Sequence, residues 1–457
     1  MRMTVIGCGY LGAVHAASMA ELGHDVVGID VDAAKIDALA AGRPPFFEPG
    51  LPELLERALA TGRLRFTTDY SAARGNAVHF VAVGTPQQPG ALAADLRYVN
   101  AAIDALAPHL DAGDLVVGKS TVPVGTARGL TDRVARSGAL LAWNPEFLRE
   151  GFAIEDTLHP DRLVYGLPDD ELDAERTREA LDEVYAATIA DGTPVVATDL
   201  ETAELVKSAA NAFLATKISF INAMSEVCEA AGADVTQLAD AIGHDARIGR
   251  RFLNAGLGFG GGCLPKDIRA FMARAGELGA DQALTFLREV DQINMRRRSR
   301  AVDLAREVLG GSVLGRKIAI LGLAFKPDSD DVRDSPALNV AAQLSLQGAS
   351  VLCHDPRAIE NARHRFPELT YVATVADAVR GADLVMVLTE WSEYRELDPA
   401  DLGDSVAQRI VIDGRNCLDS VAWRDAGWRY RALGRPRETR VSASHEAPVP
   451  VQASALA

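Results

Sequence analysis

The sequence lacks the features that mark zinc proteins, disulfide-rich proteins and nucleic-acid-binding proteins. Its five cysteines are scattered without a C-x-x-C pair, and its nine histidines lack metal-ligand spacing. This excludes a zinc site and a disulfide framework and indicates a reducing compartment. The formal net charge of −16 disfavours a nucleic-acid partner, because neutralising phosphates requires a basic surface. We interpret the one basic cluster, residues 296–300, as a solvated helix face.

Long apolar segments and a signal peptide are missing as well. No uninterrupted apolar run approaches the roughly 20 residues that a membrane-spanning helix needs. The first residues lead directly into a strand pattern, without the charged and apolar regions of a signal peptide. We therefore expect a cytoplasmic protein without a membrane partner.

The order of the apolar runs predicts an α/β fold. With 48% hydrophobic and 24% charged residues, the 457-residue chain has a globular composition and room for two or three domains. Up to about residue 145, short β-rich runs alternate with helical stretches, which predicts a parallel sheet covered on both faces. The same strand pattern returns at 317–321 and 350–354, as a degenerate internal duplication would produce.

The middle of the chain reads differently. Residues 199–231 are Ala-rich, free of proline and poor in glycine, which predicts one long helix, and we expect further helices at 265–275 and 282–308. The sequence thus predicts two Rossmann-like doubly wound domains joined by a central helical layer with a long helix.

A glycine-rich loop follows the first predicted strand and opens a helix. Within its sequence GCGYLG, Gly7 would make the tight turn, Gly9 would admit a pyrophosphate and Gly12 would let the helix pack closely on the strand. The pyrophosphate would lie at a helix N-terminus. Asp30, which ends the second predicted strand, can accept from both ribose hydroxyls and would repel a 2′-phosphate. We therefore expect NAD rather than NADP.

A second glycine-rich loop, residues 256–262, leads to Cys263. Five glycines in seven residues build a loop whose backbone can wrap closely around a ligand. Pro265 suits the first turn of a following helix, so Cys263 would stand at a helix N-terminus near Lys266, a setting that lowers a thiol pKa. Asp267 would lie within reach of a group bound at the sulfur. These features favour a nucleophilic thiolate, whereas the other cysteines read as small buried hydrophobes.

Two pairs of polar residues allow a functional and a structural interpretation. Lys207 and Asn211 are four residues apart and share one helix face, where they could stabilise an alkoxide. Their spacing alone favours a solvated polar stripe. Glu146 and Glu150 follow a predicted strand end, with the same ambiguity.

Taken together, these motifs resemble the UDP-glucose/GDP-mannose dehydrogenase family. The resemblance covers about residues 1–430, and its joint motifs make it highly specific. They are GCGYLG at 7–12, STVPVGT at 120–126, NPEFLREG at 144–151, Lys207 with Asn211, GFGGGCLPKD at 258–267, FKPDSDDVRDSP at 325–336 and DGRN at 413–416.

The resemblance implies a division into three domains. Residues 1–198 would bind NAD, 199–308 would form a helical dimerisation domain, and 309–434 would bind the UDP-sugar. The remaining residues, 435–457, are rich in Ala, Ser, Pro and Val without periodicity, which predicts a disordered tail. The partners implied are a small-molecule UDP-sugar and a second copy of the chain in a homodimer. No metal is expected. The residues expected to bind NAD are Gly7, Gly9, Tyr10, Leu11, Gly12, Asp30, Lys35, Thr85, Thr121, Glu150, Lys266 and Arg333.

The resemblance also implies a substrate site, with Arg247 reaching into the neighbouring subunit. The substrate-binding residues would be Glu146, Phe147, Leu148, Arg149, Glu150, Lys207, Asn211, Arg247, Phe252, Leu253, Asn254, Gly256, Gly260, Phe325, Lys326 and Arg415.

The implied reaction is a four-electron oxidation of a sugar C6 alcohol to a carboxylate, with two NADH formed per sugar. Cys263 would carry a thiohemiacetal and then a thioester. Lys207 and Asn211 would stabilise the oxyanion, Asp267 and Thr121 would position or deprotonate water, and Glu146 would act as acid or base in hydrolysis.

UDP-glucose is the expected substrate, giving UDP-glucuronate for polysaccharide biosynthesis. GDP-mannose and UDP-N-acetylhexosamines are alternatives within the family. A β-hydroxyacid-type dehydrogenase and a non-catalytic NAD-binding protein are more distant alternatives. Neither of these would need both a nucleophilic cysteine and a second nucleotide-binding half.

Overall fold

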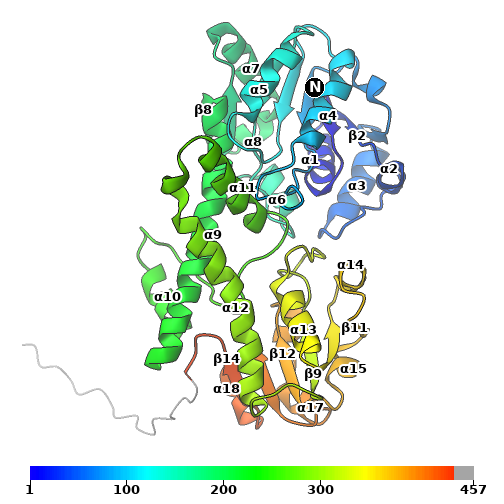
Figure 1. Cartoon of the computed structure of the whole chain (residues 1–457). Coiled ribbons are helices and arrows are strands. Elements are labelled where there is room, and N and C mark those ends of the chain that lie inside the picture. Colours follow the sequence, from blue (N-terminus) through cyan, green and yellow to red (C-terminus); the bar gives the residue numbers. More distant parts are fainter. Residues whose placement is uncertain (437–457) are drawn as a thin grey trace, which may run out of the picture.

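A computed structural model describes residues 1–436. Two lobes, each built around a sheet, lie beside a column of helices that includes α9 and α12 (Figure 1). The fold class predicted from the sequence, two Rossmann-like units with a long central helix, is confirmed. The predicted tail lies outside the described residues from position 437 onward. Among residues 1–436, no helix is both long and apolar enough to cross a membrane.

The N-terminal sheet has eight strands in the order β3-β2-β1-β4-β5-β6-β7-β8. All neighbours pair in parallel except β6 with β7. Three of these strands, β3, β7 and β8, were not predicted; β3 and β8 are the sheet edges, and β8 is largely exposed, so it lacks a buried apolar run. The strands are β1 (Arg2–Ile6), β2 (Asp25–Ile29), β3 (Leu64–Thr67), β4 (Val78–Val81), β5 (Leu115–Gly118), β6 (Leu140–Trp143), β7 (Leu163–Leu167) and β8 (Val195–Asp199).

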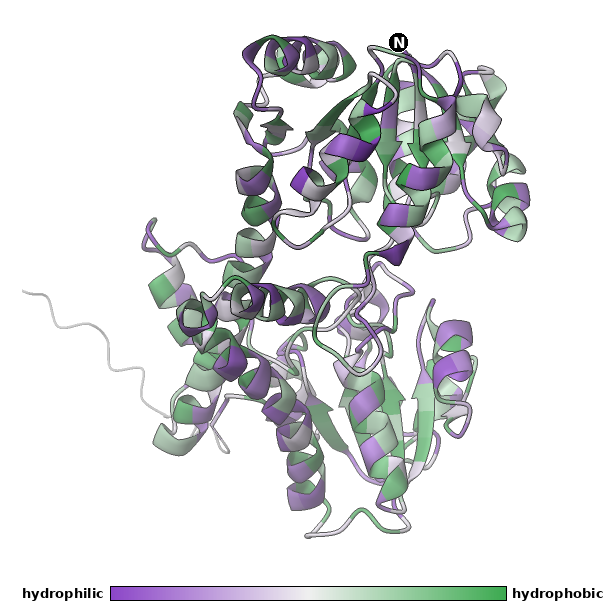
Figure 2. Ribbon diagram, turned by 45° about the horizontal axis from the view of Figure 1, so that its top comes forward, coloured by the Kyte–Doolittle hydropathy of each residue, from purple (hydrophilic) through white to green (hydrophobic). Residues whose placement is uncertain are grey.

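Helices cover both faces of this sheet, which therefore has a hydrophobic core on each side. Met3 and Val5 of β1 belong to one core and Ile6 to the other, as expected for a strand whose side chains alternate. Figure 2 shows the apolar strands enclosed by helices that carry polar residues outward. The helices are α1 (Tyr10–Glu21), α2 (Ala33–Ala40), α3 (Leu51–Ala60), α4 (Arg97–Leu106), α5 (Thr126–Ala135), α6 (Ala153–Leu158), α7 (Glu171–Val184) and α8 (Ala186–Ala190).

The central layer consists of α9 (Leu200–Ala231), α10 (Val235–Gly243), α11 (Leu264–Glu277) and α12 (Phe286–Val308). The side chain of Asp199 caps the start of α9 by accepting from Thr202 N, and Gly232, with φ of +77°, ends the helix. The predicted helix at 282–308 begins later, at Phe286, because a short 3-10 turn precedes it.

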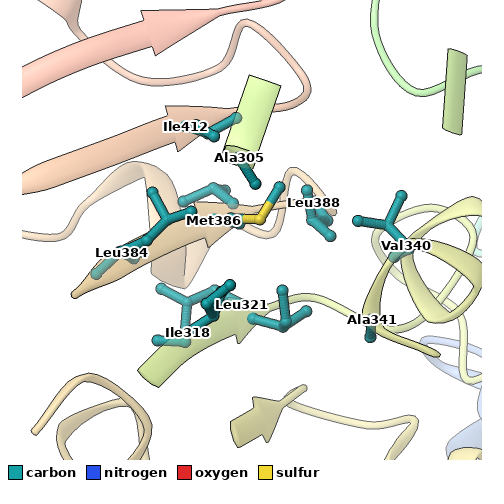
Figure 3. Close-up of a cluster of buried hydrophobic side chains, with 14 of the residues drawn as sticks. Ala305, Ile318, Leu321, Val340, Ala341, Leu384, Met386, Leu388 and Ile412 are labelled. Atoms are coloured by element: carbon teal, nitrogen blue, oxygen red, sulfur yellow. The ribbon is translucent and has the colours of Figure 1, made fainter. Parts of the chain in front are cut away.

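The C-terminal sheet has six parallel strands in the order β11-β10-β9-β12-β13-β14. Its core includes Ala305 of α12, which lies near Ile412, and Val340 and Ala341 of α13 (Figure 3). The last turns of α12 therefore belong to this core. The strands are β9 (Lys317–Leu321), β10 (Ser350–His354), β11 (Thr370–Tyr371), β12 (Leu384–Val387), β13 (Ile410–Asp413) and β14 (Arg429–Ala432); the helices are α13 (Pro336–Leu346), α14 (Ile359–Arg365), α15 (Val375–Val379), α16 (Ser392–Arg395), α17 (Pro399–Gly403) and α18 (Ser420–Asp425).

Candidate active site

The first glycine-rich loop leaves an open cradle at the start of α1. Gly7 has a φ of +89°, a conformation that favours glycine, and a Cβ atom at Gly12 would lie 1.8 Å from the carbonyl oxygen of Gly7. At Gly9, in contrast, no atom of residues 1–436 beyond its chain neighbours and helix lies within 4 Å of a Cβ position. The open side of Gly9 and the free N–H groups of the helix fit a pyrophosphate.

Asp30, at the end of β2, is buried and faces this loop. Its carboxylate accepts hydrogen bonds from the backbone N–H groups of Cys8 (2.8 Å) and Asp32 (3.0 Å). Lys35 Nζ lies 2.9 Å from Oδ2. A carboxylate fixed here suits the ribose hydroxyls of NAD and repels the 2′-phosphate of NADP. The residues present therefore fit NAD.

Glu48 supports the same loop and was not predicted from the sequence. It is buried and accepts hydrogen bonds from the Tyr10 hydroxyl and from the N–H groups of Gly151 (2.6 Å) and Ala153 (2.7 Å). Burial raises the pKa of Glu48, and these hydrogen bonds oppose the increase. Tyr10 and Gly151 lie 38 and 103 residues from Glu48 in the chain, so no local motif reveals the cluster.

A cleft opens between the N-terminal domain and the helices α9 and α11. The Thr85 hydroxyl donates to the carbonyl oxygen of Thr121 over 2.7 Å at its rim. Four of the predicted site residues therefore line one cleft, although they come from three separate segments. Residues lining it include Thr85, Thr121, Val124, Leu205, Lys266, Asp267, Phe271 and Arg274.

Glu204 of α9 connects the wall of this cleft to the central layer. Its buried carboxylate accepts from the N–H groups of Gly125 (2.6 Å) and Ala127 (2.7 Å) at the start of α5. A carboxylate at a helix N-terminus is stabilising. Burial nevertheless raises the pKa of Glu204 to about 7. Sequence reasoning missed this residue because its partners lie in another domain.

The second glycine-rich loop is held from two sides. On the helical side, Gly256 N donates to Asn222 (2.9 Å), and Asn294 of α12 exchanges two hydrogen bonds with the backbone of Phe259. On the other side, Arg415 of the C-terminal domain donates to the carbonyl oxygens of Gly258, Phe325 and Leu388. The loop thus joins the helical layer to the C-terminal domain.

Small residues are required in this loop. A Cβ atom at Gly260 would lie 2.5 Å from the carbonyl oxygen of Asp334, and one at Gly261 would lie 2.8 Å from the Phe325 ring. The close approach brings Phe325, which was predicted to bind the substrate, against the loop that leads to Cys263.

Cys263 stands at the start of α11, as predicted, and is exposed to solvent. Asp267 lies one turn along the helix and accepts from Asn211 Nδ2 over 2.6 Å and from Lys266 Nζ. Asn211 is buried, so the interpretation of a solvated polar stripe is wrong for this residue. Lys207 lies with its ammonium group 5.4 Å from the centre of the Phe147 ring.

The predicted lowering of the Cys263 pKa is wrong. The surrounding protein raises the pKa of the thiol, and the negative charge of Asp267 adds to the increase. The positive charges of Lys207 and Lys266 oppose it. The prediction considered the helix N-terminus and Lys266, but it left out the carboxylate one turn away.

Glu150 joins the N-terminal domain to the C-terminal domain. Its carboxylate accepts from Ser329 (2.9 Å) and Arg333 (3.3 Å), and its carbonyl oxygen accepts from Lys326. Burial and the neighbouring Asp331 raise the pKa of Glu150 to about 7. The structure therefore brings together Glu150, Lys326 and Arg333, which were predicted separately as ligand-binding residues.

Glu146 forms an ion pair with a buried lysine. Its Oε2 atom is 3.2 Å from Nζ of Lys119, and its Oε1 atom accepts from the N–H groups of Phe147 and Leu148. Lys119 was not predicted from the sequence. The Phe147 ring, stacked under Arg162, connects this segment with Lys207.

The arginine cluster at 296–300 is only partly a solvated face, since Arg296 alone is largely exposed. Arg297 and Arg298 are buried, and Arg297 donates to the carbonyl oxygen of Gly256 (3.1 Å) and to Ser225 (2.8 Å). Arg298 pairs with Asp334 at 2.9 Å. Burial lowers the pKa of Arg297, which Glu229 and Glu226 counteract. Arg297 and Arg298 were misread because their acceptors lie 36 to 72 residues away in the chain.

Several predicted substrate residues do not reach the cleft within one chain. Arg149 pairs with Asp156 (2.6 Å), and Arg247 pairs with Asp245 (2.6 Å) with an 89% exposed side chain. Three further predicted substrate residues, at positions 252–254, lie around the helical layer. Phe252 has a φ of +66°, Leu253 is buried between helices, and Asn254 accepts from Arg250.

A loop with the geometry of the NAD-binding loop also follows the first strand of the C-terminal sheet, but protein donors occupy the carboxylate that corresponds to Asp30. Gly322, with φ of +103°, follows β9 as Gly7 follows β1, and Asp355 takes the place of Asp30. Its carboxylate is surrounded by protein donors: the N–H groups of Leu323, Ala324, Arg357 and Ala358 and the Trp391 indole. No comparable acceptor remains for the ribose of a dinucleotide.

Comparison with known proteins agrees with this arrangement. The NAD binding domain of the UDP-glucose/GDP-mannose dehydrogenase family matches residues 1–189, its central domain matches 201–296, and its UDP binding domain matches 319–420. The chain belongs to this family. It is an oxidoreductase with an NAD-binding N-terminal domain and a UDP-binding C-terminal domain.

Relatives match over nearly the whole chain. UDP-glucose 6-dehydrogenase YwqF of Bacillus subtilis is 43% identical over 95% of this chain and 98% of its own. UDP-glucose 6-dehydrogenase of Rhizobium meliloti is 42% identical over 95% and 100%. The solved UDP-glucose dehydrogenase of Pyrobaculum islandicum superposes with a TM-score of 0.86 at 41% identity, covering 95% of this chain and 98% of the other.

Proposed function

We propose that this enzyme oxidises the C6 alcohol of UDP-glucose to the carboxylate through a covalent intermediate on Cys263. The observation that carries the proposal is the position of Cys263, beside Asp267, Lys207 and Lys266, at the end of a loop held by the UDP-binding domain. The relatives named for UDP-glucose support this sugar nucleotide as the substrate.

The two ligands would occupy opposite sides of the cleft. The loop 7–12 and Asp30 hold NAD, with Thr85 and Thr121 at the sheet edge. Lys326, Arg415 and the loop 256–260 hold the nucleotide sugar. The bound NAD supplies a hydride acceptor for each of the two oxidations, and the second requires a fresh NAD.

The first oxidation converts the C6 alcohol to an aldehyde. The hydroxyl proton passes to a water molecule as the C6 hydride is lost to the coenzyme. Asn211 and Lys207 stabilise the oxygen as negative charge develops on it. Asn211 suits this role because Asp267 already fixes its amide orientation.

The second oxidation takes place at the sugar carbon while it is bonded to the Cys263 sulfur. The Cys263 sulfur bonds to the aldehyde carbon and the thiol proton passes to the oxygen, which gives a thiohemiacetal. Loss of a second hydride and of the hydroxyl proton leaves a thioester. Because the pKa of the thiol is raised, it enters as a neutral group and loses its proton during the addition.

Hydrolysis completes the cycle. Water bonds to the acyl carbon, the carbon–sulfur bond breaks, and the sulfur regains a proton. Thr121 and Asp267 position this water and Glu146 takes its proton. The sum is one UDP-sugar, two NAD and one water converted to one UDP-sugar acid, two NADH and two protons.

A substrate panel tests the proposal. UDP-glucose, GDP-mannose and UDP-N-acetylmannosamine would each be supplied with NAD, and the NADH formed per sugar consumed would be counted. We expect two NADH per UDP-glucose and little turnover of the others. Turnover of GDP-mannose alone, or one NADH per sugar, would overturn the assignment. UDP-N-acetylmannosamine belongs in the panel because a UDP-D-ManNAc dehydrogenase of Pyrococcus horikoshii superposes with a TM-score of 0.83 at 27% identity, covering 96% of this chain and all of the other.

A homodimer is part of the proposal. Phe213, Phe220 and Val227 form a stripe of exposed apolar side chains on α9 at seven-residue spacing, continued by Leu205. Such a stripe on a long helix suits the pairing of two helices. Arg247, extended away from its own cleft, would contact the sugar nucleotide of the partner.

The absence of disulfides among residues 1–436, where all five cysteines are free, supports a cytoplasmic location.

A further inference from the structure

The ammonium group of Lys119 is buried beside the sheet. Lys119 follows β5, and its side chain is 3% exposed. Nζ donates to Asn144 Oδ1 (2.9 Å) and to the Tyr185 hydroxyl (3.3 Å), and it lies 3.2 Å from Glu146 Oε2. An ammonium group has three N–H donors. Two of them therefore have a protein acceptor, and the Glu146 carboxylate lies beside the ammonium group as its ion-pair partner.

Both oxygens of the Glu146 carboxylate also have protein partners. One oxygen accepts from the N–H groups of Phe147 (2.8 Å) and Leu148 (3.2 Å), and the other faces Lys119. Its side chain is 13% exposed. Among residues 1–436, Lys119 is the only partner with which Glu146 forms an ion pair. A charged group this far from water requires a partner, so removing one charge leaves the other uncompensated.

Arg162 lines the same small chamber as Glu146, but its guanidinium lies over the Phe147 ring, and no ion pair joins Arg162 to Glu146 in residues 1–436. His15 lines the same small chamber and is fully buried, and neither of its ring nitrogens has a hydrogen-bond partner among residues 1–436. Burial, and next the charge of Lys119, lower the pKa of His15 well below its ordinary value, so the imidazole is neutral. The rings of Phe80 and Tyr185 lie 5.7 and 5.8 Å from Nζ.

Lys119 also connects two segments of the cleft. It directly precedes Ser120 and Thr121, and the carbonyl oxygen of Thr121 accepts from Thr85. Through Asn144 and Glu146 it is attached to the segment 144–150, whose Phe147 ring faces Lys207. One buried lysine therefore relates the position of Thr121 to that of Glu146.

We propose that Lys119 is a positioning residue for the hydrolysis of the Cys263 thioester. It fixes the Glu146 carboxylate so that this group takes the proton of the attacking water while the carbon–sulfur bond breaks. Lys119 touches neither substrate nor sulfur and acts through Glu146. The proposal rests on the proposed function and adds a requirement to its last step.

The test is Lys119→Met in the full-length enzyme with UDP-glucose and NAD. We expect kcat to fall about 10²-fold, as for loss of a positioned acid or base. KM for both ligands should change little, because neither ligand contacts Lys119. A covalent sugar-nucleotide adduct on Cys263 should accumulate, visible as a mass increase of the intact protein. Tyr185→Phe is the matched control: it removes one neutral partner of Lys119, keeps the ion pair, and should accumulate no adduct.

A double variant separates positioning from a general structural effect. Lys119→Met added to Glu146→Gln should slow the enzyme no further, because Lys119 acts through Glu146. Additive losses, unchanged kcat, or weaker NAD binding without an adduct would each overturn the proposal. If Lys119→Met does not fold, Lys119→Gln, which keeps a donor for Asn144 but no charge, decides by the same measurement. One NADH per sugar from the unaltered enzyme would instead refute the proposed function itself.

Discussion

Asn211 of α9 and Asp267 of α11 meet in the cleft, where the amide Nδ2 donates to the carboxylate Oδ2 over 2.6 Å. Both side chains are buried. Lys266 pairs with the second oxygen of the same carboxylate. The hydrogen bond therefore orients an amide and a carboxylate within one helical turn of Cys263.

Replacing Asn211 should affect both stability and rate. Asn211→Ala leaves a buried carboxylate oxygen without its donor, which costs about 1–3 kcal/mol of the free energy of unfolding. It also removes a donor to the developing oxyanion, and we expect kcat to fall about 10²-fold. Thermal unfolding and steady-state rates check this. Thr216→Ala on the same helix, which removes only a hydroxyl bonded to Ala212, is the control; equal losses in both variants would contradict the role of Asn211.

Asp30 should determine the choice of coenzyme. The unaltered enzyme should use NAD at least about 10²-fold better than NADP by kcat/KM, because the carboxylate repels a 2′-phosphate. Asp30→Ser should reduce this ratio to near unity by weakening the binding of NAD. Asp32→Ser alters only the cap of α2, where Asp32 accepts from Lys35 N, and should keep the preference. Comparable use of the two coenzymes by the unaltered enzyme would refute the assignment.

Two substitutions at Cys263 should have different effects on the reaction. Cys263→Ala should bind NAD and UDP-sugar normally and lose steady-state oxidation by several orders of magnitude. Cys263→Ser should accumulate a stoichiometric adduct, because a hydroxyl adds slowly and its ester hydrolyses much more slowly than a thioester. Intact-protein mass and peptide mapping to Gly258–Lys266 check this. Cys353→Ala, at a fully buried cysteine, controls for loss of a thiol. Near-native turnover by Cys263→Ala would exclude covalent catalysis.

The exposed stripe on α9 should hold two chains together. Phe220→Glu places a charge within it and should convert a dimer into a monomer in light scattering, with most of the activity lost. Arg247→Ala should leave the dimer intact and raise KM for the UDP-sugar. Leu172→Glu, at a leucine on α7 that is 65% exposed against 47% for Phe220, should change neither the dimer nor KM. A monomeric chain with full activity at assay concentration would rule the dimer out as the active form.

Glu204 predicts a pH dependence of stability. Burial raises its pKa from 4.5 to about 7, so between these values the folded chain holds a proton that the unfolded chain releases. Its contribution is therefore present below about pH 4.5 and is lost as the pH rises toward 7. Glu204→Gln should reduce this decline in thermal unfolding midpoints measured from pH 5 to 8. Glu201→Gln is the control, because Arg128 lowers the pKa of Glu201; a decline unchanged in Glu204→Gln would contradict the assignment.

Local motifs carried the successful predictions. Gly7, Gly9, Gly12 and Asp30 could be read from the sequence because a strand, a turn and a helix start impose their spacing within about 25 residues. Cys263 with Asp267 could be placed for the same reason, as one helix turn separates them.

The missed residues depend on contacts between distant segments. Glu48, Lys119 and Glu204 read as ordinary surface charges until the fold brings their partners to them. Arg297 was misread because a run of arginines on a helix usually faces solvent, whereas here Arg297 donates to Gly256 in the loop before Cys263 and Arg298 pairs with Asp334. The predicted direction of the Cys263 pKa shift was wrong because the surrounding protein and the Asp267 carboxylate outweigh the nearby lysines.

The occupied carboxylate of Asp355 has a consequence for competition between NAD and the sugar nucleotide. Both halves of the enzyme share a strand, a left-handed glycine and an acidic residue, so a dinucleotide could in principle enter either half. Five protein donors already occupy the Asp355 carboxylate, so NAD gains no ribose contact there. A rise in coenzyme concentration therefore fills one site only, and the sugar nucleotide keeps its own site without having to outbind an abundant rival.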